Sequence, residues 1–324
     1  MSRLAVLLIA VVTACGGKST PPPTTPLPAD KPPEPEAKKE PPPAPEKPPE
    51  PLGPVEVKIP ASAVSVKLVS AGKGKKAPLR YSAKPGDKQQ VELAMDFSAK
   101  QTENGTSQDQ IVPTIVLTGD AETKTVDKDG NAAYTLTVNT TDARDVAGSQ
   151  IPAEKFRTVL GSLAGLTISS SLGANGAVGD VTMRVEKPTE MSAGALELIR
   201  LTLPSFPVLP KEPVGVGAKW QATTSAKLAD KLDVTQVTDY ELVAQKGTSW
   251  TIKGKTKVTG ADQKMQGGDI SAIKGTGSSE ATLADGTLYP AYKTSLETEF
   301  TAAEAGKSMQ FALKVGGAVT PAKK

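Results

Sequence analysis

The feature that most constrains the fold of this chain is an alternation of apolar and polar residues that recurs along its length. Between residues 91 and 97, for example, Val91, Leu93, Met95 and Phe97 alternate with polar or small residues. The same alternation is found for Val64, Val66 and Leu68; for Tyr134, Leu136 and Val138; for Trp250, Ile252 and Val258; for Leu288, Tyr292, Leu296 and Phe300; and for Met309, Phe311, Leu313 and Val315. A period of two predicts strands with one buried and one solvated face, which is typical of antiparallel sheets.

Turn sequences separate these windows. The dipeptides are Asn104-Gly105, Asp129-Gly130, Asn175-Gly176 and Asp285-Gly286. Asn-Gly and Asp-Gly favour the positive backbone angles of tight hairpins. The sequence therefore predicts a mainly β fold made of one or more curved antiparallel sheets.

Two segments have helical periodicity instead. Residues 153–164 place Phe156, Val159, Leu160 and Leu163 on one face, and residues 189–203 do the same with Met191, Ala195, Leu198 and Ile199. Thr189 is the predicted N-cap of the second helix, and Pro204 is expected to end it.

The β-rich part, residues 55–324, has two halves of similar order, about 55–187 and 204–324, joined by the second helix. The segment LGANGAVGDVTMRVE resembles TLADGTLYPAYKTSLETE, since each has a turn followed by an expected long strand. A duplication and a simple recurrence of β patterns both explain this likeness. The halves are expected to form either two lobes or one continuous curved sheet.

The N-terminus has the features of an export signal. Arg3 precedes an apolar run at 4–12, which is too short to span a bilayer. The residues before Cys15 resemble the lipobox of bacterial lipoproteins. That resemblance implies a signal peptide at 1–14, lipidation of Cys15 and a membrane anchor made of acyl chains. An ordinary secretory signal with a chance cysteine is the alternative. Gly16 and Gly17 favour the outer membrane, on its periplasmic or surface side.

A proline-rich segment follows the cysteine. Residues 21–54 hold 16 of the 28 prolines, mixed with Glu, Lys, Ala and Thr. Proline has no amide donor, so this segment is expected to be a disordered, semi-rigid polyproline II spacer. Residues 15–54 are thus predicted to tether the β-rich domain. A ligand for a partner that binds PxxP motifs is the alternative.

Composition argues against several classes of function. The chain has no His and one Cys, so it lacks both the usual neutral-pH base and any thiolate metal site. No disulfide can form within the chain, and its net charge of +3 shows no basic stripe of the kind that binds nucleic acid. The chain is expected to need no metal or cofactor and not to be an enzyme.

Three weaker motifs were weighed. Ser70 with Lys73, and Ser271 with Lys274, match the SxxK spacing of Ser-Lys hydrolases, but the companion motifs are absent. Residues 127–131 resemble part of a calcium loop, although Ala132 and Val138 stand where the motif needs Gly and Glu, so a hairpin turn is predicted. Trp220 and Trp250 are candidates to line a ligand site, with core packing as the alternative.

The order of a Gly-Asp-Lys turn before a long strand, a helix ending in a Pro-rich loop, and PVGVGAKW resembles uncharacterised envelope lipoproteins of Gram-negative bacteria. Those proteins carry a domain of unknown function, and the likeness covers roughly residues 79–319. The architecture is also similar to half-barrel lipoprotein carriers, whose curved sheet holds acyl chains. We therefore expect a non-enzymatic binding or carrier module for an apolar ligand. A stalked structural lipoprotein that interacts with an envelope protein is the second hypothesis, and a Ser-Lys hydrolase the third.

Overall fold

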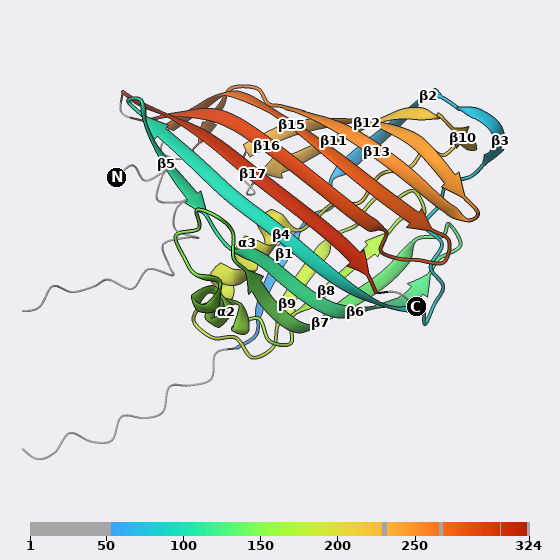
Figure 1. Cartoon of the computed structure of the whole chain (residues 1–324), viewed down its shortest axis with the longest axis horizontal. Coiled ribbons are helices and arrows are strands. Elements are labelled where there is room, and N and C mark those ends of the chain that lie inside the picture. The colour runs from blue at the N-terminus through green and yellow to red at the C-terminus, as the bar shows by residue number, and fades with distance from the viewer. Residues whose placement is uncertain (1–52, 229–231, 266–267, 305, 323–324) are drawn as a thin grey trace, which may run out of the picture.

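A computed structural model describes residues 53–228, 232–265, 268–304 and 306–322. Cys15, the signal peptide and the tether lie outside the described residues. Figure 1 shows a large, strongly twisted antiparallel sheet with two short helices on one face. The mainly β fold predicted from the sequence is confirmed.

The strands of the first half alternate with the first helix. They are β1 (Val55–Ile59), β2 (Ala63–Ser70), β3 (Lys73–Ala77), β4 (Lys88–Glu103), β5 (Thr106–Ile111), β6 (Thr114–Val126), β7 (Ala132–Arg144), α2 (Ala153–Gly161), β8 (Thr167–Leu172) and β9 (Val181–Val185). The second helix and the remaining strands are α3 (Ser192–Thr202), β10 (Val214–Val216), β11 (Lys219–Leu228), β12 (Leu232–Lys246), β13 (Ser249–Thr259), β14 (Gln263–Met265), β15 (Gly268–Ala284), β16 (Ala291–Glu304) and β17 (Lys307–Pro321).

Strands from both halves of the sequence share the large sheet. Its order is β1-β9-β8-β7-β6-β4-β17-β16-β15-β13-β12-β11-β2, while β5 pairs with β4 and β14 pairs with β15. The junction between the halves is the long antiparallel pair of β4 and β17. A small second sheet pairs β3 with β10.

The two ends of this sheet are consecutive in the chain. β1 pairs with β9 at one edge, and β2 pairs with β11 at the other. Only three residues, Pro60, Ala61 and Ser62, separate them. The backbone N–H of Ala61 donates to Asp180 Oδ1 at 2.7 Å, which fixes this link to the β9 side. A short connection of this kind requires the sheet to curl until its edges approach one another.

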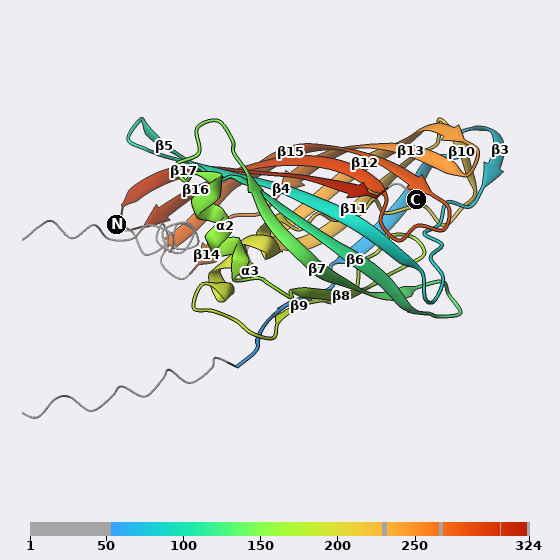
Figure 2. The ribbon, with the colours of Figure 1, turned by 60° about the horizontal axis from the view of Figure 1, so that its bottom comes forward.

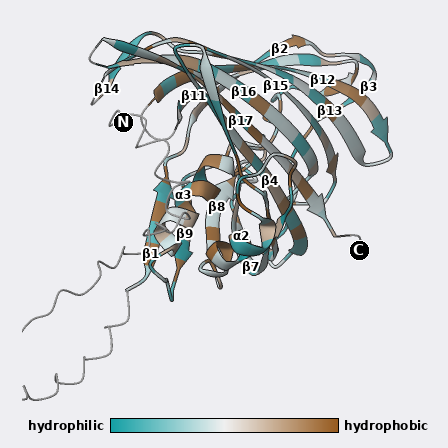
Figure 3. Cartoon of the chain, turned by 60° about the vertical axis from the view of Figure 1, so that its left-hand side comes forward, coloured by the Kyte–Doolittle hydropathy of each residue, from teal (hydrophilic) through white to brown (hydrophobic). Residues whose placement is uncertain are grey.

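One face of the sheet is apolar and the other is polar. Figure 3 shows hydrophobic and hydrophilic residues alternating along the strands. In β4 the buried side chains are Val91, Leu93, Met95 and Phe97, as the alternation predicted. The inner-facing residues of both halves belong to one continuous hydrophobic cluster. Burial of this shared apolar face is the main force that holds the sheet in its curled form.

Both helices lie on the inner face, toward the end of the molecule where β5 and β14 are found (Figure 2). Helix α2 packs on β7, and α3 packs on β1, β4 and β17. Phe156 and Leu160 of α2 are buried, as are Ala195, Leu198 and Ile199 of α3, and this agrees with the predicted apolar faces. Neither described helix has the length and apolarity needed to cross a membrane.

Two details of the prediction were wrong. Helix α3 begins at Ser192 rather than after Thr189, and Met191 is 41% exposed instead of belonging to the apolar face. The long strand expected after Asn175-Gly176 is the five-residue β9, and Pro188 follows it closely. Proline cannot continue the ladder because it lacks the amide donor.

The predicted turns are confirmed. Gly105, Gly130, Gly176 and Gly286 all have positive φ angles between 71° and 86°. Gly176 is also constrained by packing, because a Cβ atom there would overlap the carbonyl oxygen of Pro207.

Candidate functional site

A central segment, residues 203–213, fills one part of the inner face between α3 and β10. Phe206, Val208 and Leu209 of this segment are buried. The segment contains four prolines, so it offers few amide donors, and its carbonyl groups must find donors elsewhere.

Side chains of the sheet supply those donors. Tyr81 donates its hydroxyl to Pro207 O at 3.0 Å, and Trp220 donates Nε1–H to Val208 O at 2.7 Å. Arg80 donates to the carbonyls of Pro210 and Lys211 at 3.1 and 2.8 Å. The central segment is therefore held by specific hydrogen bonds and acts as part of the core.

All five tyrosines of the chain surround this segment at the β3–β10 end of the sheet. They are Tyr81, Tyr134, Tyr240, Tyr289 and Tyr292, and each is at most 8% exposed. Burial raises the pKa of every one of these phenols, and it does so most strongly for Tyr81 and Tyr289. None is poised to act as a base near neutral pH.

The structure places the two predicted tryptophans differently. Trp220 is 1% exposed and stacks on Tyr240 with ring centroids 5.5 Å apart, so it is a core residue. Trp250 lies near the start of β13, is half-buried and packs against the core. The two side chains belong to different rows of the inner face, since Trp250 pairs with Leu283 and Trp220 with Tyr240.

A band of half-buried residues crosses the inner face next to this aromatic region. We call it the inner band and define it by two adjacent rows in register across seven strands. One row is Val66, Ala222, Thr238, Thr256, Gly277, Leu296 and Val315; the other is Val64, Thr224, Gln236, Val258, Gly275, Thr298 and Leu313. Six strand spacings of about 4.8 Å make the band roughly 29 Å long.

The inner band is exposed where the rest of the inner face is buried. Thr238, Thr256 and Leu296 are half-buried, as are Val64 and Val66 at its β2 end. The aromatic residues Trp220 and Tyr240 border it on one side, and Ile273, Phe300 and Phe311 border it on the other; all five are buried. The helices pack on other strands, apart from β17, so they leave most of the band uncovered.

The chemistry of the inner band changes along its length. Its centre, on β11 to β13, is polar, and the hydroxyls of Thr238 and Thr256 are 2.9 Å apart. Its ends are apolar, with valines on β2 and Leu296 and Val315 on β16 and β17. Gly275 and Gly277 reduce the height of the surface on β15, where neighbouring backbone or side-chain atoms leave no room for a Cβ atom. This surface matches an elongated ligand that is apolar with a few hydrogen-bonding groups.

The outer face is polar, and its charges alternate from strand to strand. One row contains Lys219, Glu241, Lys253, Glu280 and Lys293 on five neighbouring strands. The Lys253–Glu280 and Lys219–Glu241 pairs are 3.4 and 3.8 Å apart and exposed, so each contributes little stability. The arrangement keeps this face solvated.

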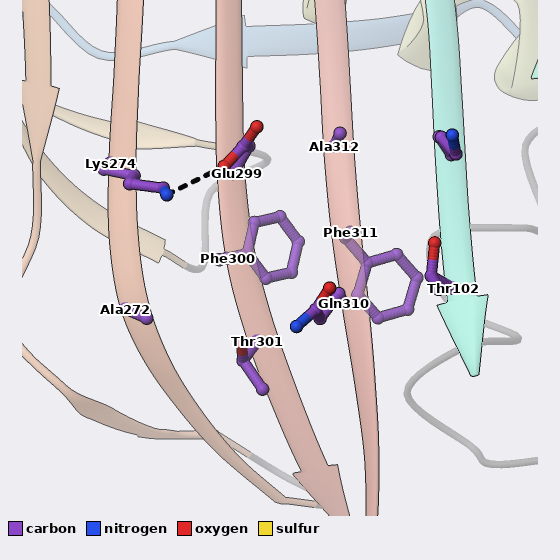
Figure 4. A pocket seen from close by; sticks show the side chains of 10 residues that line it. Thr102, Ala272, Lys274, Glu299, Phe300, Thr301, Gln310, Phe311 and Ala312 are labelled. Atoms are coloured by element: carbon purple, nitrogen blue, oxygen red, sulfur yellow. Dashed lines mark ion pairs between the residues drawn. The ribbon is translucent and has the colours of Figure 1, made fainter. Parts of the chain in front are cut away.

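Two shallow depressions lie on the sheet among these charged residues. The first has a volume of about 370 Å³, and Figure 4 shows Lys274 paired with Glu299 at its edge, 3.1 Å apart. Its wall includes Gln310 and Ala312 of β17. The second, of about 650 Å³, is lined by residues such as Lys255, Ser278 and Lys293. Neither gathers a set of groups with an evident catalytic arrangement.

The remaining motifs do not come together as a site. Lys73 is exposed, and Lys274 is exposed and paired with Glu299, so neither SxxK lysine has the buried amine that a dyad needs. Asp127 accepts from the backbone N–H groups of Asp129 and Asn131, which confirms a hairpin turn. Within the described ranges no group of three or more potential metal ligands is present.

Sequence reasoning missed the inner band. The signal available was the presence of Thr256, Gly277 and Gln236 at positions whose neighbours along the same strand are apolar. Such residues were interpreted only as tolerated strand residues. Which of them are uncovered depends on where the helices pack, and the pattern of a single strand does not contain that information.

Comparison with known proteins gives little guidance. A model for a family of unknown function (DUF6263) matches residues 191–285, which run from the start of α3 to the end of β15. No curated protein matches the chain. Among solved structures, the chain is similar to the OccK11 (OpdR) protein of Pseudomonas aeruginosa at 7% identity, covering 74% of this chain and 99% of that one. The TM-score is 0.20, so this likeness carries no argument.

Proposed function

We propose that this protein is a non-enzymatic binding module that holds an elongated, largely apolar ligand on its inner band. The observation that carries the proposal is the exposure of the band within an otherwise buried face. Uncovered inner positions on β2, β11, β12, β13 and β16 are half-buried, whereas their neighbours in the flanking rows are buried. Exposed apolar surface of this extent commonly marks a binding site.

The ligand is inferred from the chemistry of the band. Valine and leucine side chains at the two ends favour contact with hydrocarbon, and each buried methylene group contributes about 0.8 kcal/mol. Thr224, Gln236, Thr238 and Thr256 at the centre favour a hydroxyl, amide or ester group of the same ligand. A molecule with acyl chains and an uncharged polar linkage combines both properties.

A fluorescent fatty acid tests this proposal. We expect 11-(dansylamino)undecanoic acid to gain fluorescence when it binds the protein. Thr256→Phe places a large ring over the centre of the band and should weaken binding about tenfold, equivalent to ~1.4 kcal/mol. The matched control is Thr276→Phe, because Thr276 is exposed on the outer face of the neighbouring strand β15. Its affinity should stay close to that of the unchanged protein.

Two results would contradict the proposal. One is the absence of probe binding to the unchanged protein. The other is equal weakening by Thr256→Phe and Thr276→Phe, which would place the probe elsewhere. Thermal unfolding of both variants shows whether they remain folded, and Thr256→Val, which keeps the shape of the side chain, serves as a milder second variant.

We also propose that the module is displayed in the cell envelope by a lipid anchor at Cys15. The support is the short apolar run at 4–12 and the lipobox-like residues before the only cysteine of the chain. Two or more acyl chains are needed for stable anchoring. Cells grown with labelled palmitate should incorporate it into the protein, and Cys15→Ser should abolish the incorporation. Labelling that persists in the variant would refute the anchor.

A stalked interaction protein is the second candidate function. The observation that favours it is the pair of outer-face depressions, which lie in a surface of regularly alternating charge. Capture of one envelope protein that is lost on Lys274→Glu but not on Thr256→Phe would support this candidate over ligand binding.

A further inference from the structure

A basic tip projects from the end of the molecule where β3 and β10 pair, at the far right of Figure 1. We define the basic tip as Lys67 and Val69 of β2, Lys73, Lys75 and Lys76 of β3, and Val216 of β10. Val216 pairs with Lys73 in register, and the N–H of Gly215 donates to Ala71 O at 2.9 Å. These contacts hold the end of β2, β3 and β10 together.

The charge of the basic tip is unbalanced. The sequence has no Asp or Glu from residue 57 to residue 86, although elsewhere on the outer face Lys and Glu alternate. All four lysines of the tip are exposed, and none takes part in an ion pair within the described chain. The nearest acid in sequence to β10 is Glu212, two residues before it. An excess of positive charge therefore remains at this end.

The basic tip also exposes apolar side chains. Val69 is 65% exposed and Val216 is 41% exposed, and they are two of the three large hydrophobic residues that are exposed in the described chain. The turn that joins β2 to β3 is tight, since Gly72 has a φ of +73° and a Cβ atom there would overlap Gly215 O. The valines are thus presented on a fixed framework next to uncompensated lysines.

We propose that the basic tip docks on the surface of a bilayer that contains anionic lipids. Lysines near such a surface are attracted to the headgroup phosphates, at about fivefold in affinity for each residue. Exposed apolar side chains enter the boundary between headgroups and acyl chains. A soluble anionic polymer would use only the lysines, whereas a bilayer uses the lysines and the valines together. This inference is independent of the ligand proposed for the inner band.

Vesicle sedimentation tests the docking. The full chain is used with Cys15→Ser in every sample, so that no acyl chain is attached and the N-terminal segment is constant. We expect binding to vesicles of phosphatidylcholine with 30% phosphatidylglycerol, about a hundredfold stronger than to phosphatidylcholine alone. Lys73→Glu, Lys75→Glu and Lys76→Glu combined should remove this difference. Raised salt should weaken the binding as well.

Two controls separate docking from general charge and from polymer binding. Lys253→Glu, Lys255→Glu and Lys257→Glu combined make the same change of charge on the outer face of β13 and should retain most of the binding. Val69→Ser with Val216→Ser should weaken vesicle binding about tenfold without changing the affinity for soluble polyphosphate. Equal loss in the two lysine variants, or vesicle binding that is indifferent to the valine changes, would overturn the proposal. The second result would identify the tip as a site for a soluble anionic polymer.

Discussion

At the scale of single residues, the distribution of tyrosine is the most informative feature. The chain has few aromatic residues, yet all five tyrosines lie in one region of the core, around the central segment. Their hydroxyls bind one another or nearby polar groups: Tyr134 and Tyr289 share a hydrogen bond, and Tyr240 bonds with the backbone of Val208. A buried phenol is tolerated when its hydroxyl has a partner. The tyrosines therefore position the proline-rich central segment and fill the space around it.

The pH dependence of stability follows from these phenols. Burial raises the pKa of all five, so the folded state holds their protons more tightly than the unfolded state does. Their contribution to stability is fully present below pH 10, the ordinary pKa of tyrosine, and is lost as the pH rises above it. We expect no tyrosinate absorbance at 295 nm while the protein is folded, followed by a single steep rise that coincides with the loss of circular dichroism.

A gradual rise in absorbance near pH 10, with the circular dichroism unchanged, would show that at least one phenol is accessible in the folded state. Tyr134→Phe provides a control. It should reduce the final absorbance by about one fifth, because it removes one of the five phenols, and it should leave the single steep transition in place.

At the scale of elements, the start of α3 shows what the sequence could and could not predict. The helix, its apolar face and its end before Pro204 were predicted, because these depend on residues close in sequence. The start was not, because Ser192 replaces Thr189 in its role through a contact with α2. Ser192 accepts a hydrogen bond from the N–H of Thr189 at 2.8 Å and donates to Ser162 O at 2.7 Å. Thr189 only accepts a 3.3 Å bond from the N–H of Met191.

This difference predicts unequal effects of removing the two hydroxyls. Ser192 is fully buried, so Ser192→Ala leaves Ser162 O without its donor and should lower the free energy of unfolding by about 1–3 kcal/mol. Thr189 is exposed, and Thr189→Ala should cost less than about 0.5 kcal/mol. Urea unfolding measures both values. A larger cost for Thr189→Ala would restore Thr189 as the residue that fixes the helix start.

The same reasoning explains why the strands were predictable and the inner band was not. Alternation in β4 or β17 states which side chains share a face, and the structure confirms those faces. It does not state whether another element covers that face. Coverage depends on the placement of α2, α3 and the central segment, and on the curl of the sheet. These are contacts between residues far apart in sequence, so the exposure of Thr238 or Thr256 could not be derived from the strand pattern.

At the scale of the whole molecule, the two halves are bound into one structure in three ways. Strand β4 of the first half pairs along most of its length with β17, the last strand of the chain. The turn at Asp285-Gly286 is held by Ser82, whose hydroxyl donates to Asp285 Oδ1 at 2.5 Å and accepts from the N–H of Gly286 at 2.9 Å. Strands β1 and β2, both from the first half, complete opposite edges of the sheet. A similarity between the halves, if it reflects duplication, is therefore not accompanied by separate packing.

This architecture predicts that the halves unfold together, and a distant substitution can test it. Ile115 of β6 is fully buried in the first half, whereas both tryptophans belong to the second. Ile115→Ala should lower the free energy of unfolding by about 2–5 kcal/mol. If the core is cooperative, the urea midpoint measured by tryptophan fluorescence must fall as far as the midpoint measured by the fluorine signal of 3-fluorotyrosine at Tyr134. The control is Val216→Ala, because Val216 is exposed and should leave both midpoints nearly unchanged. A tryptophan midpoint that stays fixed while the Tyr134 signal moves to lower urea would mean that the β4–β17 pair joins two units that fold separately.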